Sequence, residues 1–156
     1  MADELTHLDD RGNARMVDVG EKQTTSRIAV AEAHVTLSPV IKARLFGGDL
    51  PKGDALGVAR IAAIMATKQT SSLIPLCHPI PIDGVDVTID ETEHGARIEV
   101  TTRTSAKTGI EMEAMTAAAI GAVALYDMVK GIDRGAEVAS VRLLHKSGGK
   151  SGEWNR

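Results

Sequence analysis

The stretch RIAVAEAHVTL, residues 27–37, decides the fold because its side chains alternate in character. One side is entirely apolar and consists of Ala29, Ala31, Ala33, Val35 and Leu37. The other side carries the polar residues Glu32 and His34. A period of two residues is typical of a β-strand with one face on the core. The sequence therefore predicts a strand over 27–37 whose second face meets water or a functional site.

Further strands and helices are predicted on the C-terminal side of this strand. The strands are expected over 85–89, 96–105 and 138–144, the first two joined as a hairpin by a turn at 93–95. The helices are expected over 39–46, 54–69 and 109–132. Thr108 and Glu111 have the spacing of a capping box, which favours a helix start at 109.

This order of elements predicts an α+β fold, the ferredoxin-like split βαβ plan with an additional helix and an antiparallel four-stranded sheet. Helices would cover one face of the sheet and leave the other to water or to another subunit. Residues 1–24 have no sustained period and are expected to form an extended or mobile arm. Residues 25–156 then form a single domain with a Gly- and Lys-rich C-terminal tail.

Composition excludes several classes of protein. The 156 residues suit one domain, and the aromatic share of 2% means that Ala, Val, Ile, Leu and Met must build the core. A net charge of −3 argues against binding of nucleic acid or anionic membranes by bulk charge. The longest apolar run, 117–126, is too short to span a membrane. A single cysteine allows no intrachain disulfide and suits a reducing cytoplasm.

Asp127 and Lys130 are the strongest candidates for proton chemistry. Three residues apart on a helix, they share a face. An exposed surface ion pair is the ordinary alternative. However, the almost uncharged run 115–126 precedes them, so we expect partial burial and shifted pKa values, as general acid–base catalysis requires.

Glu113 lies fourteen residues before Asp127 and faces the same way. The helical rise separates the two by roughly 21 Å, so one site could use both only with a long ligand or across two subunits. Cys77 and His78 are adjacent in a segment stiffened by prolines, where neighbouring side chains point apart. We therefore expect Cys77 to be a small buried hydrophobe and His78 to contact a ligand; no spacing supports a metal site.

The tail, residues 145–152, carries Lys146 and Lys150 on either side of two glycines. A Walker loop is excluded because Leu144 stands where its first glycine is needed. The two lysines could still bind phosphate oxygens, with a solvated terminus as the equal alternative. From the residues alone, the chain is an α+β oligomer suited to an anionic, phosphate-bearing ligand.

Seven stretches in combination carry a family resemblance. They are TH at 6–7, MVDV at 16–19, KGD at 52–54, IPLCHP at 74–79, KTGIEMEA at 107–114, YDM at 126–128 and KSGGKSG at 146–152. Together they resemble the cyclic pyranopterin monophosphate synthases, the C-protein family of molybdenum cofactor biosynthesis. The resemblance extends over nearly the whole chain, from about Leu5 to Trp154.

The resemblance implies a lyase that converts (8S)-3′,8-cyclo-7,8-dihydroguanosine 5′-triphosphate to cyclic pyranopterin monophosphate and releases pyrophosphate. It implies a ferredoxin-like fold and a cytoplasmic homohexamer, a trimer of dimers with sites at subunit interfaces. A radical S-adenosylmethionine GTP cyclase would supply the substrate. No cofactor is required, although Mg²⁺ could accompany the triphosphate. No nucleic acid, membrane or resident metal is implied.

The resemblance also implies roles for individual residues. Asp127 would be catalytic, with Lys130 as its partner and Lys146 joining them from the tail. The substrate-contacting stretches map onto Leu76, Cys77, His78, Met112 and Glu113. Beyond the resemblance, Lys52, Lys68 and Arg27 are our candidates for contacts with the triphosphate, and Lys150 of the tail is a further substrate-binding candidate.

Three other functions compete with this one. An RNA-binding module of this fold would need aromatic residues on its sheet, and no aromatic falls in a predicted strand. A regulatory module that senses a small ligand would keep His78 and the lysines without needing Asp127 to titrate. A nucleotide-ring hydrolase on the same fold would most simply depend on a metal.

Overall fold

The computed structural model describes residues 7–150 and 152–156. Thr6 and Ser151 of the quoted motifs, and the first six residues of the predicted arm, lie outside the described residues. The elements in chain order are β1 (Thr25–Thr36), α1 (Pro39–Gly47), α2 (Ala55–Leu73), β2 (Gly84–Thr92), β3 (Gly95–Ala106), α3 (Glu111–Val129), β4 (Glu137–Ser147) and β5 (Trp154–Asn155).

The sheet has the order β2-β3-β1-β4-β5, and every pairing is antiparallel. The predicted α+β class and antiparallel sheet are confirmed. The sequence predicted four strands, and the fifth is the two-residue β5, which pairs with β4. β4 continues past its predicted end at Leu144 to Ser147, so Lys146 of the tail is part of a strand. β5 also puts Trp154 in a strand, where no aromatic was expected.

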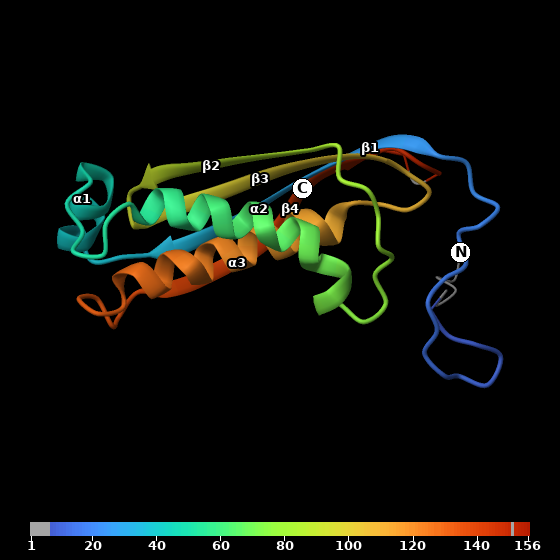
Figure 1. Cartoon of the computed structure of the whole chain (residues 1–156), viewed down its shortest axis with the longest axis horizontal. Helices are drawn as coiled ribbons and strands as arrows, with labels where there is room; N and C mark the ends of the chain where they lie inside the picture. The colour runs from blue at the N-terminus through green and yellow to red at the C-terminus, as the bar shows by residue number, and fades with distance from the viewer. Residues whose placement is uncertain (1–6, 151) are drawn as a thin grey trace.

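Helices α2 and α3 lie together on one face of the sheet (Figure 1). The apolar side of β1 meets them, since Ala29, Ala31, Ala33 and Val35 are at most 2% exposed, as the alternation predicts. The two helices approach closely because small residues meet between them. A Cβ atom at Gly121 would lie 3.2 Å from the Cβ of Ala63. Close packing of alanine and glycine thus replaces the bulk that aromatic residues would supply.

The start of α3 differs from the prediction. The helix begins at Glu111 with Ile110 as its N-cap residue and no capping side-chain hydrogen bond, so the Thr108–Glu111 capping box is wrong. The Glu111 carboxylate instead accepts from Lys146 Nζ of β4 at 2.9 Å. A contact between elements far apart in the chain has therefore replaced the local cap. The helix ends at Val129, before the predicted 132, and α2 continues from the predicted 69 to Leu73.

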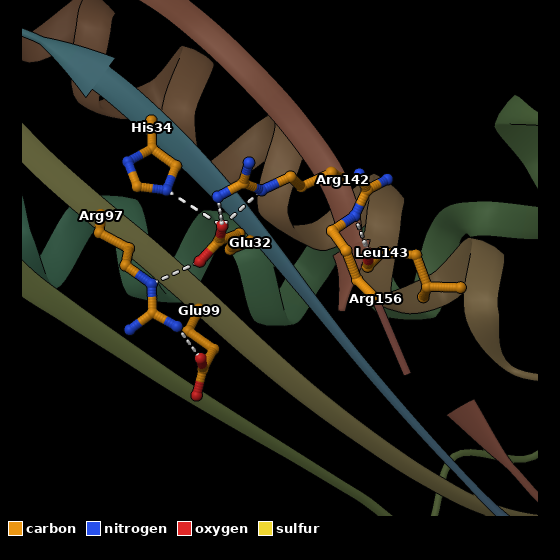
Figure 2. A network of polar contacts seen from close by, with 7 residues as sticks. All are labelled: Glu32, His34, Arg97, Glu99, Arg142, Leu143 and Arg156. Carbon is orange, nitrogen blue, oxygen red and sulfur yellow. Dashed lines mark hydrogen bonds and ion pairs between the residues drawn. The ribbon is translucent and has the colours of Figure 1, made fainter. Parts of the chain in front are cut away.

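The face of the sheet that turns away from α2 and α3 carries a network of charged side chains (Figure 2). The sequence predicted that this side of the strand meets water or a functional site; Glu32 is only 3% exposed, so water is excluded for this residue. Its carboxylate accepts from Arg97 Nε at 2.5 Å and Arg142 Nε at 2.6 Å, and His34 Nε2 lies 3.1 Å away. The long arginine side chains of β3 and β4 cover it, because antiparallel registry brings them beside Glu32.

Among the described helices, α3 alone has the length and hydropathy of a membrane-crossing segment. Its inner face is part of the core, with Ala114, Ala118, Leu125 and Val129 at 0% exposure. The helix packs against both α2 and the sheet, so its high hydropathy is that of a core helix.

Candidate active site

Helix α3 carries polar side chains at both of its ends. At the C-terminal end, Asp127 Oδ1 lies 2.6 Å from Lys130 Nζ, and Asp127 Oδ2 lies 3.4 Å from Lys52 Nζ. Lys52 Nζ also donates to the main-chain carbonyl of Asp127 at 2.6 Å. The loop before α2 thus brings Lys52 to the pair that helical spacing predicted.

The Asp127 group is exposed in the single chain, with 56% of its side-chain surface accessible. The expected partial burial is wrong here because the apolar run 115–126 packs inward, whereas Asp127 turns outward. A hydrogen bond from Lys130 lowers the pKa of Asp127, and the charges of Lys130 and Lys52 act in the same direction. The same hydrogen bond raises the pKa of Lys130. At neutral pH the pair is therefore a carboxylate beside an ammonium.

The N-terminal end of α3 borders an open cleft of about 360 Å³, here called the smaller cleft. Its lining includes the residues for which the family resemblance predicts substrate contact, Leu76, Cys77, His78, Met112 and Glu113. The segment after α2 and the first turn of α3 therefore meet, although the chain separates them by about 35 residues.

Glu113 is the buried acid of this cleft, at 4% exposure. Burial raises the pKa of Glu113 to about 7, and the nearby charge of Glu111 adds to that effect. Burial also raises the pKa of the Cys77 thiol, and Glu113 raises it further. A thiol with a raised pKa is a poor nucleophile at neutral pH. Cys77 is only partly buried, so the prediction of a buried hydrophobe is wrong in its depth.

His78 is tied to the N-terminal arm. Its Nε2 lies 2.7 Å from the main-chain carbonyl oxygen of Val17. A carbonyl oxygen can only accept, so His78 Nε2 must carry the proton. In the neutral imidazole, this leaves Nδ1 as the acceptor.

A larger cleft of about 970 Å³ lies beside the first, and its lining holds five cations and the three carboxylates of Asp18, Glu21 and Glu111. Its positively charged lining residues are Lys22, Arg27, Lys107, Lys146 and Lys150. Sequence reasoning had singled out Arg27, Lys146 and Lys150, and the structure gathers them with Gly148 and Gly149 between β1 and the tail. It missed Lys22 and Lys107, of which only Lys107 had a signal, as the first residue of the KTGIEMEA motif.

The remaining predicted residues are not brought together in one chain. Lys146 pairs with Glu111 at one end of α3, whereas Asp127 is at the other, about 24 Å along the helix. Lys52 lies with Asp127, and Lys68 is exposed on α2, outside the linings of both clefts. Within residues 7–150 and 152–156, no three His, Cys, Asp or Glu side chains are grouped to hold a metal ion.

Comparison with known proteins gives consistent results. Residues 16–149 match the MoaC family. A protein of Roseiflexus castenholzii is 53% identical over 96% of both chains. One of Pelotomaculum thermopropionicum is 51% identical over 97% of this chain and 91% of its own, and one of Brucella ovis is 49% identical over 99% and 94%. All three relatives are named cyclic pyranopterin monophosphate synthase.

Proposed function

This chain belongs to the MoaC family and is an enzyme of the cyclic pyranopterin monophosphate synthase type, acting in molybdenum cofactor biosynthesis; from this premise we propose that it acts on the cyclised dihydro form of GTP. The reaction is the conversion of (8S)-3′,8-cyclo-7,8-dihydroguanosine 5′-triphosphate to cyclic pyranopterin monophosphate and pyrophosphate. One observation supports this substrate above others. A cleft with a buried acid adjoins a cleft lined by five cations, which matches a purine-derived ring joined to a triphosphate.

In this proposal the smaller cleft holds the ring. Glu113 is the only carboxylate of the described chain that is both nine-tenths buried and within this cleft. An ionised carboxylate can accept two hydrogen bonds from the amidine edge of a guanine-derived ring. Those donors favour the charged form, so binding of the ring would lower the pKa of Glu113 from its value of about 7 in the free protein.

The larger cleft holds the triphosphate in the same proposal. A sugar hydroxyl attacks the α-phosphorus, the bond from that phosphorus to the bridging oxygen of the β-phosphate breaks, and pyrophosphate leaves with the electron pair. Negative charge grows on the leaving group, and Arg27, Lys146 and Lys150 can stabilise it electrostatically. The conversion is redox-neutral, so the proposal requires no redox cofactor.

Asp127 and Lys130 would reach this site from a second copy of the chain. Within one chain, the length of α3 separates them from Glu113 by roughly 21 Å. Asp127 is a carboxylate and Lys130 an ammonium at neutral pH, which are the protonation states of a base and an acid. Their mutual pairing moves both pKa values away from neutrality, so in this proposal the substrate separates the pair before it exchanges protons. A homohexamer built as a trimer of dimers, in the cytoplasm and downstream of a radical S-adenosylmethionine GTP cyclase, belongs to this proposal.

The decisive experiment is turnover of the cyclised dihydro-GTP, followed through pyrophosphate and the pterin product. Wild-type protein should form both in equal amounts, and a folded protein that forms neither would contradict the proposed reaction. Asp127→Asn should abolish turnover without changing the oligomer size. Near-normal turnover by that variant would remove Asp127 from its role.

Mixed oligomers test whether two copies share a site. Asp127→Asn and Lys146→Gln should each be inactive alone. When their subunits are exchanged into mixed oligomers, a site can receive an intact Lys146 from one copy and an intact Asp127 from the other. Recovery of turnover on mixing is the expected result. No recovery, in mixtures shown to have exchanged subunits, would contradict a shared site.

A further inference from the structure

Residues 16–23 form a strap that runs past both clefts. The strap belongs to no helix or strand, and only Val17 and Val19 are half-buried. Both of these side chains line the smaller cleft, whereas Asp18 between them lines the larger one. Apolar burial alone is therefore a small contribution to holding this segment in place.

Two side chains from the site hold the strap by its backbone. His78 Nε2 bonds the carbonyl oxygen of Val17 at 2.7 Å, and Lys107 Nζ donates to the carbonyl oxygen of Gly20 at 2.5 Å. These partners come from the segment after α2 and the loop before α3, which border the clefts. The strap is thus fixed at two points, three residues apart. Between the strap's own residues, Gly20 N donates to Asp18 Oδ1 at 2.7 Å and shapes a turn.

Lys22 follows this turn and lines both clefts. Thr108, Gly109 and Glu111 are the other residues common to the two linings, so Lys22 lies at the boundary between the clefts. Among the described residues, none of the ion pairs includes Lys22, although the carboxylates of Asp18, Glu21 and Glu111 line the same clefts. The Lys22 ammonium forms no ion pair with those carboxylates, so it can bind an anionic group that crosses from one cleft into the other.

We propose that the strap is a preformed wall of the site, that Lys107 and His78 are positioning residues that hold it, and that Lys22 contacts the substrate where its ring joins its phosphates. This inference rests on the proposed function for the identity of the substrate. Its physical basis is preorganisation, because a wall fixed before binding spares the complex the entropy of ordering it. Lys107 therefore acts through the strap rather than on the reacting atoms.

Limited trypsin digestion tests whether Lys107 holds the strap in place. Lys107→Met keeps the apolar stem of the side chain but removes the donor, and cleavage after Lys22 should become about tenfold faster because a charge-assisted hydrogen bond is lost. Lys107→Arg still donates and should restore the wild-type rate. Cleavage after Arg11, in the same arm but outside the strap, is the internal control. If cleavage after Lys22 in Lys107→Met were as slow as in wild type, Lys107 would not hold the strap, and the proposal would be overturned.

Binding of inorganic triphosphate, measured by calorimetry, tests Lys22. Lys22→Gln should bind this probe about tenfold more weakly, because one charge-assisted contact is lost. Arg11→Gln removes the same charge from the same arm and should change the affinity less than about twofold. Equal affinities of Lys22→Gln and wild type would show that Lys22 does not contact the phosphate groups and would overturn this part of the proposal. Both measurements need no turnover, so they separate a failure of this inference from a failure of the proposed reaction.

Discussion

Glu32 on the open face of the sheet and Glu113 at the start of α3 are buried almost equally, at 3% and 4% exposure, yet their pKa values are shifted in opposite directions. Burial raises the pKa of both carboxyl groups. For Glu32, hydrogen bonds from Arg97 and Arg142 outweigh burial and lower the pKa to about 2. Among the described residues no arginine bonds to Glu113, and its pKa rises to about 7. Partners, rather than depth, decide whether a buried acid is ionised.

The difference separates a carboxyl group with a structural role from one whose protonation can change near neutral pH. Glu32 is locked between two guanidinium groups, one of which also bonds Glu99 (Figure 2). Such a group cannot release or take up a proton in the physiological range. Glu113 borders an open cleft and can do both near neutral pH. Perturbed acids that face clefts are candidates for function, and the substrate contact of Glu113 stays a prediction that this position in the cleft allows.

The largest expected effect comes from removing the ionised acid. Glu32→Ala should lower the free energy of unfolding by about 4 kcal/mol, because Arg97 and Arg142 lose their shared counter-charge. Urea unfolding at pH 7 measures this. Glu99→Gln is the matched control, since Glu99 also pairs with Arg97 but is partly exposed, and it should cost about 1 kcal/mol or less. Equal losses in the two variants would contradict a special role for burial.

The dependence of stability on pH should have opposite signs for the two acids. Glu113 has a folded-state pKa of about 7 against an ordinary 4.5, so the folded protein binds the extra proton and loses stability as pH rises from about 4.5 to about 7. The loss should be about 3 kcal/mol. Glu32, with a folded-state pKa of about 2, instead loses its contribution as pH falls from about 4.5 to about 2.

Glu113→Gln isolates the contribution of Glu113, which acts between about pH 4.5 and about pH 7. Unfolding measured from pH 4.5 to 7 should show a smaller decline in this variant than in wild type, because no proton is released. The pH 2 to 4.5 window should be unchanged, since Glu32 is still present. If the unfolding free energies of wild type and variant ran parallel from pH 4.5 to 7, Glu113 would be ionised throughout this range. Its pKa would then not be raised, and the contrast with Glu32 would be contradicted.

A smaller effect should appear in the reactivity of Cys77. Burial raises the pKa of its thiol first, and the charge of Glu113 adds to that. Glu113→Gln removes only the second cause, so alkylation by iodoacetamide at pH 8 should become about threefold faster, through a larger thiolate fraction. At pH 6, where Glu113 is largely protonated, the two proteins should react at similar rates. Identical rates at both pH values would show that the carboxylate does not act on the thiol.

Local sequence patterns predicted the elements better than they predicted the contacts between them. The alternation in 27–37 identified the core side of β1 because that pattern depends only on the geometry of a strand. The same alternation could not distinguish a Glu32 in water from one buried under Arg97 and Arg142. Those arginines lie 65 and 110 residues away, and only the registry of the sheet brings them there.

The site was predicted unevenly for the same reason. Stretches such as 74–79 and 107–114 carried the family resemblance and do meet at one cleft. Lys22 had no signal, because its importance comes from the path of the strap, which depends on two long-range hydrogen bonds. The apolar run before Asp127 indicated burial of that stretch but not of every face of the helix. The roles of Asp127, Lys130 and Lys146 remain predictions.

The smallest expected effect is the coupling between Glu111 and Lys146, which are 2.9 Å apart but about 30% exposed. A double-mutant cycle with Glu111→Gln and Lys146→Gln should give a coupling energy of about 0.5 kcal/mol, because water and salt screen a partly exposed pair. The same cycle on Glu32 and Arg97 should give several times as much. Both pairs join elements of the same fold at similar distances, so their ratio measures what burial adds to an ion pair. Equal coupling energies would mean that burial does not strengthen the Glu32–Arg97 ion pair.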